Sequence, residues 1–488
     1  MVSLIVAVLL AATPLVDAVR ADDAAAVVAL IEQGADVNAA EPDGATALHW
    51  AAYLDQADVV TRLLDAGAEA GVANDLAVTP LHLAAANGNL AIVRALLAHG
   101  ADPDAATEAG VTPLMEAARR GSAAVAGELL AKGADVNARE SSRGQTALMW
   151  AAAGRHPAVV RVLLEHRPDV GARTKTRELT VMLDQGPRRT VKTSVQDARP
   201  IERGGSTALL FAAQEGATES AKLLLAAGAD VNDTAADGRS ALVLAAFSGH
   251  GEVARALLDA GADPDADGAG YTALHAAALR GDVATVKALL ARGADPNARL
   301  TNGSPVRRFG SQWALSRAIA GATPLLVAAA YLEVPIVRAL LDGGADPSIG
   351  LPDGTTPLLA AAGARVEVLT RPTDLERWNM VDSDQPVAPR AEGDVLAAVT
   401  ALADRGADVN AATEEGNTAL HEAAATGLTT VIKVLAAHGA ALDAKNKQGQ
   451  TPLDLTLPIP PIREGFPPVS PGYPEAEALL RQLGATGR

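Results

Sequence analysis

The 488-residue chain has no cysteine, few aromatic residues and a deficit of positive charge. Without cysteine, disulfides and thiolate metal sites are excluded, and the redox state of the compartment stays open. Aromatic residues make up 2% of the chain, so the 49% apolar share is mostly alanine, leucine and valine. Because the net charge is −17, most of the surface repels nucleic acid and acidic membranes, and we expect neither as the main partner.

The chain begins with an apolar run, MVSLIVAVLLAA, over residues 1–12. A run of this length is too short to span a bilayer, and it resembles the hydrophobic region of a secretory signal peptide. No Lys or Arg precedes it, however, and the cleavage site is poor. We expect a periplasmic or secreted protein, most simply bacterial, whose mature form does not insert into a membrane. The alternative is a cytoplasmic chain in which the run is an apolar cap on the first repeat.

One stretch, Val78–Gly110, recurs with variations along almost the whole chain. Thr79 is placed to cap the N-terminus of a helix, and Pro80 comes next at the first helical position, where a missing N–H is harmless. Apolar residues at helical spacing then predict two short amphipathic helices, and Gly100 comes after the second one at a C-cap. A unit this small cannot bury two apolar stripes alone, so we expect the units to stack on one another.

The capping threonine marks each unit of this series. It recurs at Thr13, Thr46, Thr79, Thr112, Thr146, Thr207, Ser240, Thr272, Thr323, Thr356, Thr418 and Thr451. Most steps are 32 to 34 residues, and three longer steps of 61, 51 and 62 residues predict inserts.

The pattern T-[PA]-L-H-x-A-A, continued by V-x-x-L-L-x-x-G-A-D-[VP]-N at a period of 33, resembles the ankyrin repeat. The resemblance covers nearly the whole chain in twelve units. It implies an all-α solenoid of helix-turn-helix units with β-hairpin-like fingers between them. It also implies a groove lined by the first helices and the fingers, where such proteins usually hold partners.

The repeat positions and the long steps predict the organisation of the chain. Residues 1–12 are the signal-peptide region, 13–173 repeats 1–5, 174–204 a finger insert, 205–299 repeats 6–8, 300–322 a second finger insert, 323–456 repeats 9–11 and the start of 12 with an inter-helix insert at 364–392, and 457–488 a proline-rich loop and C-terminal capping helix.

The inserts have their own patterns. In the first, the run ELTVML, a Gly-Pro turn and a second alternating run, RTVKTSV, predict a β-hairpin. The second is expected to contain a short helix near Trp313. Together the two finger inserts carry about +6 on an acidic chain, so they either meet an acidic partner or fold back on the acidic body.

Eleven of the twelve units place glycine after the second helix, whereas the fifth has Arg167 there. A non-glycine residue is disfavoured in a left-handed conformation, so we expect that helix end to be distorted.

No pattern of residues predicts catalysis, a cofactor or a metal site. The nine histidines lie where the ankyrin pattern commonly has histidine, four of them in the T-x-L-H slot, and the resemblance implies that they tie turn to helix. Asp263, Asp265 and Asp267 begin a sequence similar to a calcium loop, but Leu274 occupies the twelfth position, which requires glutamate.

Aromatic residues and arginines are the types enriched at binding hot spots. The candidates for partner contact are Tyr53, Arg119, Arg120, Phe247, Tyr271, Tyr331, Arg307, Arg308 and Trp313. Trp50, Trp150 and Phe211 are instead expected to pack between neighbouring repeats.

These observations predict a non-catalytic, monomeric scaffold that needs no cofactor and binds a protein partner in its groove. One alternative is an accessory or regulatory subunit of a single enzyme. Another is a small-ligand or enzymatic site built by the inserts, which would need a deep pocket with convergent polar groups.

Overall fold

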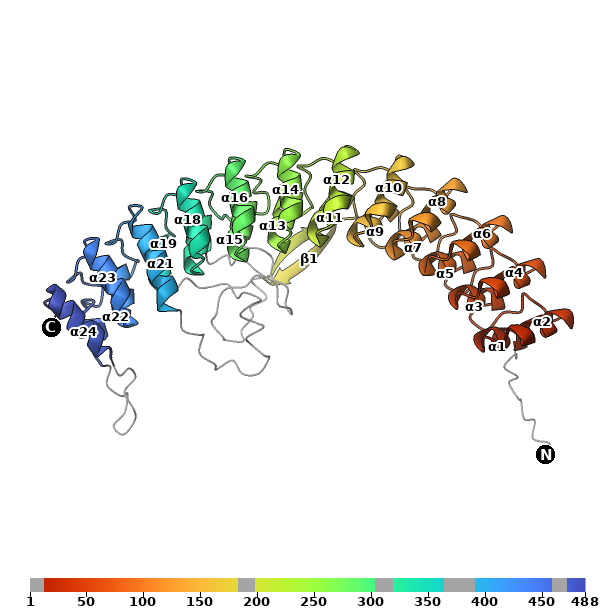
Figure 1. Cartoon of the computed structure of the whole chain (residues 1–488), viewed down its shortest axis with the longest axis horizontal. Helices are drawn as coiled ribbons and strands as arrows, with labels where there is room; N and C mark the ends of the chain where they lie inside the picture. Colours follow the sequence, from red (N-terminus) through yellow and green to blue (C-terminus); the bar gives the residue numbers. More distant parts are fainter. Residues whose placement is uncertain (1–12, 183–197, 303–318, 364–390, 459–471, 488) are drawn as a thin grey trace, which may run out of the picture. The chain divides into compact units, whose positions relative to one another are not determined.

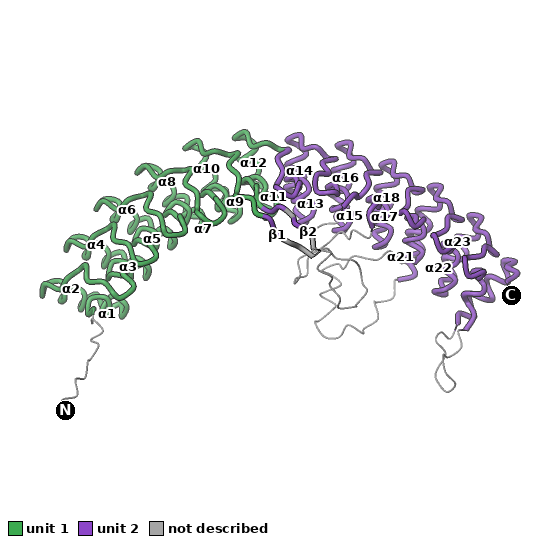
Figure 2. Tube along the Cα trace, turned by 180° about the vertical axis from the view of Figure 1, so that it is seen from behind, with its two compact units in different colours: residues 1–177, 204–231 green, residues 178–203, 232–488 purple. Residues whose placement is uncertain are grey.

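The computed structural model describes residues 13–182, 198–302, 319–363, 391–458 and 472–487 (Figure 1). The chain forms two compact units, one comprising 1–177 and 204–231 and the other 178–203 and 232–488 (Figure 2). The predicted leader at 1–12 and the candidates Arg307, Arg308 and Trp313 lie outside the described residues.

Unit 1 consists of paired helices. They are α1 Pro14–Arg20, α2 Ala24–Glu32, α3 Ala47–Tyr53, α4 Ala57–Asp65, α5 Pro80–Asn87, α6 Leu90–Ala98, α7 Pro113–Arg120, α8 Ala123–Ala131, α9 Ala147–Ala153, α10 Pro157–Glu165, α11 Ala208–Glu215 and α12 Thr218–Ala226. The odd-numbered helices are the first of each pair and pack on one another in one layer, and the second helices form another layer (Figure 1).

Unit 2 continues the pairs and adds most of a small sheet. Its helices are α13 Ala241–Ser248, α14 Gly251–Asp259, α15 Ala273–Arg280, α16 Val283–Ala291, α17 Pro324–Ala330, α18 Val334–Asp342, α19 Pro357–Ala362, α21 Glu392–Ala403, α22 Ala419–Ala425, α23 Thr429–Ala437, the 3₁₀ turn η3 Asp454–Thr456 and α24 Pro474–Leu483. The expected all-α solenoid fold is confirmed. Within the described ranges, each helix is too short or too polar to span a bilayer.

The helices begin and pack as the sequence predicts. Thr79 is the extended N-cap of α5, with Pro80 at its first position, and Thr112 accepts a hydrogen bond from the N–H of Met115 at the start of α7. Leu81 on α5 and Leu96 on α6 are completely buried. Each pair therefore buries its two apolar stripes against the neighbouring pairs of its own unit.

The residue after the second helix adopts a left-handed conformation in every unit with glycine there, for example Gly100 with φ 87°. Arg167 has φ 53°, and its N–H bonds to the Leu164 carbonyl as the glycine N–H does elsewhere. The expected distortion of this helix end is therefore wrong. The turn keeps its geometry, and the backbone of Arg167 bears the strain.

The first insert contains a two-stranded sheet of β1 Arg177–Met182 and β2 Ala198–Arg203. The sequence predicts a hairpin here, but the strand that pairs with β1 is ARPIER. The alternating run RTVKTSV lies within the undescribed residues 183–197. Pro200 makes β2 a poor strand by composition, since proline cannot donate a ladder hydrogen bond.

The last pair differs from the others at its start. Thr451 precedes the 3₁₀ turn η3 and not a full helix, and its N–H and hydroxyl both donate to Asp454 Oδ2, at 2.8 and 2.9 Å. The closing helix α24 comes after the proline-rich segment, of which residues 459–471 are outside the described part.

Candidate functional site

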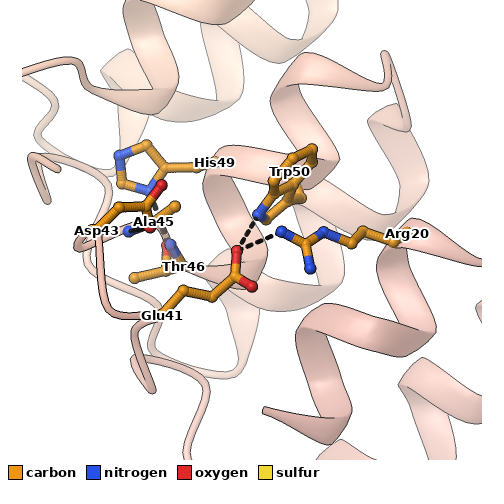
Figure 3. A network of polar contacts seen from close by, with 7 residues as sticks. All are labelled: Arg20, Glu41, Asp43, Ala45, Thr46, His49 and Trp50. Atoms are coloured by element: carbon orange, nitrogen blue, oxygen red, sulfur yellow. Dashed lines mark hydrogen bonds and ion pairs between the residues drawn. The ribbon is translucent and has the colours of Figure 1, made fainter. Parts of the chain in front are cut away.

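A histidine in the T-x-L-H slot joins each of four helix pairs to the next finger. The backbone N–H of Thr46 donates to His49 Nδ1 at 3.1 Å (Figure 3). On the other side of the ring, His49 Nε2 lies 3.0 Å from the carbonyl oxygen of Val78. Because Nδ1 accepts, Nε2 carries the proton and donates. The imidazole therefore links its own helix cap to the backbone of the next repeat.

The same contact recurs for His82, His275 and His421. Burial lowers the pKa of all four imidazoles, most for His275, whose pKa falls to about 4. A neutral ring is what this geometry requires, since a proton on Nδ1 would remove the acceptor.

A second ladder joins successive fingers. The side-chain oxygen of Asn38 accepts the N–H of Glu69 at 2.8 Å, and Asp265 accepts the N–H of Asp295 at 2.7 Å. Asn297 repeats the contact further along the second unit. These bonds hold the fingers of neighbouring repeats in register within each unit.

We define the first-helix face of unit 1 by two positions on each first helix, four and seven residues after the capping threonine. It comprises Asp17, Trp50, Leu83, Glu116, Trp150 and Phe211, and Arg20, Tyr53, Ala86, Arg119, Ala153 and Gln214. Every one of these side chains is at least partly exposed. Trp50, Trp150 and Phe211, which are predicted to pack between repeats, are half-buried and keep part of each ring on this face.

The N-terminal end of this face holds a preformed aromatic patch, made of Arg20, Trp50 and Tyr53. The guanidinium of Arg20 lies 4.0 Å from the centre of the Trp50 ring, and Glu41 accepts from both Arg20 Nη2 at 2.6 Å and Trp50 Nε1 at 2.7 Å (Figure 3). Tyr53 packs edge-on against Trp50 at 5.9 Å and is 57% exposed. One carboxylate thus fixes a cation–π stack beside an exposed phenol ring.

Arg119 and Arg120 end α7, two first helices further along. Glu116 accepts from Arg119 Nε and Nη2, at 2.9 and 2.6 Å, and the Arg119 side chain is still 63% exposed. Arg120 Nε donates to the carbonyl oxygen of Asn87 at 3.3 Å. Both guanidinium groups are held at one edge and retain donors that face solvent.

In unit 2, the equivalent positions of α13, α15 and α17 include Leu244, Leu279 and Val327. These three side chains are buried. Phe247 and Tyr331 are half-buried, and Phe247 packs against Tyr271 with ring centres 5.9 Å apart.

Tyr271 itself is only 1% exposed, and burial raises its pKa to about 12. Its expected role in partner contact is wrong, because the side chain belongs to the core of unit 2. A sequence position in a finger does not reveal that neighbouring side chains cover it.

Comparison with known proteins agrees with this geometry. Models of ankyrin repeats match residues 7–74, 48–140, 81–174, 139–235, 180–268 and 209–299, and a further ankyrin model matches 402–455. The chain belongs to the ankyrin-repeat family.

Several known proteins are similar to parts of this chain. Neurogenic locus notch homolog protein 1 is 36% identical over 141 residues, in both Xenopus tropicalis and Homo sapiens, covering 28% of this chain and 6% of those proteins. The B-cell lymphoma 3 protein homolog of Mus musculus is 29% identical over 142 residues, covering 27% of this chain and 32% of that protein. The chain thus spans only a small part of the length of these relatives.

A solved structure, the human ASB11 ankyrin repeat domain, is 27% identical and covers 52% of this chain and 100% of its own, with a TM-score of 0.42.

The calcium-like run of this ankyrin chain has another use. Asp263 Oδ1 accepts the N–H of Asp265 at 2.9 Å, and Asp265 belongs to the ladder between fingers. Among the described residues, no three His, Cys, Asp or Glu side chains are grouped closely enough to hold a metal ion.

One exposed residue of this surface was missed by the sequence reasoning. Arg155 comes after α9 with φ 59°, at a position where the pairs beginning at Thr79, Thr112 and Thr207 have glycine. The departure from glycine was visible in the sequence, and it is the signal that could have found it.

Proposed function

We propose that this ankyrin chain is a non-catalytic scaffold whose protein partner lies along the first-helix face of unit 1. The observation that carries the proposal is the aromatic patch, in which Tyr53 is exposed beside a Trp50 ring fixed by Arg20 and Glu41. Exposed tyrosine, tryptophan and arginine together are typical of binding hot spots.

The ion pairs of the face support the same proposal. Glu41 and Glu116 already orient the two arginines of the face, so little side-chain freedom is left to lose on binding. The burial of Leu244, Leu279 and Val327 leads us to restrict the binding face to unit 1.

Three further features belong to the proposal. The recurrence of the capping threonine supports twelve repeats, and we propose a monomer. Residues 1–12 support export, most simply to a bacterial periplasm.

The experiment is an affinity capture with the chain from Thr13 onward, compared with the double variant Tyr53→Ala, Arg119→Ala. The matched control is Arg62→Ala, Arg161→Ala, which changes two exposed side chains on the second helices α4 and α10 of the same unit. We expect a protein that is retained by the wild type and the control and is lost with the double variant. A partner retained equally by all three chains would contradict the proposed face.

A further inference from the structure

The structure contains a basic corner on a strongly acidic chain. It consists of Arg119, Arg120 and Arg155, at the ends of α7 and α9, and we call it the arginine corner. His156 Nε2 lies 3.2 Å from the Arg119 carbonyl oxygen, so the turn after α9 contacts the end of α7. Glu116 is the one carboxylate paired with these three guanidinium groups in the described structure.

Arg155 is the least explained member of the corner. Its left-handed backbone, with φ 59°, is disfavoured for arginine and not for glycine. Asp22 and Asp55 occupy the same position with the same strain, but each accepts a 2.8 Å hydrogen bond from the next repeat, through Gln56 and Asn89. Among the described residues, none pairs with the exposed guanidinium of Arg155. Leu332 has the same strain at the same position, and Arg167 has it after α10, so strain alone does not mark a binding residue. Arg155 differs from both because its turn contacts the end of α7, beside Arg119 and Arg120.

Resting on the proposed function, we infer that the partner presents an extended segment with acidic side chains at the arginine corner and a bulky apolar side chain at Tyr53. The three guanidinium groups attract carboxylates to the arginine corner. The rest of the chain, whose net charge is −17, repels an acidic segment that binds anywhere else. The next first helix, α11, packs on α9 and ends in the acidic residue Glu215.

We call Tyr53 and Arg119 the two anchors. The distance between them sets the number of residues between the apolar and the acidic side chains of the partner. Tyr53 on α3 and Arg119 on α7 are separated by two helix steps, with α5 between them. Packed helices are about 8–10 Å apart, so the anchors are about 16–20 Å apart. An extended chain advances about 3.3 Å per residue, which places the acidic and apolar residues about five or six positions apart. Ala86, between the anchors, leaves room for the connecting backbone.

The test uses labelled synthetic peptides with an Asp-Asp pair and a leucine separated by two, five or eight Gly/Ser residues. Each has a Lys-Lys counterpart, and binding to the full chain is measured by fluorescence anisotropy at low and high salt. We expect the five-residue spacing to bind at least about tenfold more tightly than its lysine counterpart, with the advantage falling as salt rises. Equal binding of acidic and basic peptides, or no dependence on spacing, would overturn the inference.

Variants separate the corner from general folding. Arg155→Gly removes the charge and relieves the strain, so it should weaken the acidic peptide about tenfold without lowering stability. Arg161→Ala on α10 is the charge-matched control and should leave binding unchanged. If a captured native partner is lost with Tyr53→Ala but indifferent to Arg155→Gly, the inference fails and the proposed function stands. If it is indifferent to both, the proposed function fails as well.

Discussion

His275 Nε2 lies 3.1 Å from the carbonyl oxygen of Ala322, a residue 47 positions later in the chain. The N–H of Thr272 reaches the other ring nitrogen at 3.3 Å. A completely buried, neutral imidazole thus joins the start of one helix pair to the start of the next across the second insert.

This contact makes stability depend on pH. The pKa of His275 is about 4 in the folded chain because burial disfavours the imidazolium, and it is 6.5 when the residue is exposed. Below pH 6.5 the unfolded chain takes up a proton that the folded chain does not, so stability falls as the pH drops towards 4. The difference between the two pKa values corresponds to about 3 kcal/mol in the free energy of unfolding. We expect the stability advantage of wild type over His275→Gln, measured by urea unfolding, to shrink by that amount between pH 7 and 4.

The control is His166→Gln, at an exposed position. A constant difference between wild type and His275→Gln over the same range would show that the imidazole is not held neutral.

Arg167 offers a stabilising substitution. Its φ of 53° is costly for arginine and free for glycine, so Arg167→Gly should raise the free energy of unfolding by about 1 kcal/mol. The reverse test is Gly133→Ala, where φ is 95° and a Cβ would contact nothing within 4 Å. This substitution should lower the free energy of unfolding through backbone strain alone. Loss of stability in Arg167→Gly would mean that the side chain contributes more than the strain costs.

Leu96 tests the packing between repeats. It is completely buried on α6, so Leu96→Ala should cost about 2–5 kcal/mol through the cavity it leaves. Leu76→Ala removes the same atoms at a position that is 62% exposed and should be nearly neutral in the same thermal or urea unfolding experiment. Similar effects of the two changes would contradict the assigned packing.

Local signals predicted most of the fold. A threonine followed by proline, as at Thr79 and Pro80, indicates the start of a helix, and a glycine such as Gly100 indicates its end. These signals can be read locally because each residue acts on the backbone next to it. Leu96 could be placed in the core because its spacing matches the helical period.

The rest depends on contacts between distant residues. The burial of Tyr271 comes from neighbours such as Phe247 that no local pattern identifies. The cation–π stack of Arg20 on Trp50 joins two repeats through the finger residue Glu41, and the sequence predicted the residue types but not the contact. The departure from glycine at Arg155 is visible in the sequence, but its contact with the end of α7 is visible only in the structure.

The most direct test of the binding face is a hydrogen-exchange comparison of the chain alone and with its captured, purified partner. Binding along the first-helix face predicts protection in α3, α5 and α7 and at the turn that contains Arg155, with little change in α4, α6 and α8. Protection confined to those second helices, or to unit 2, would contradict the account.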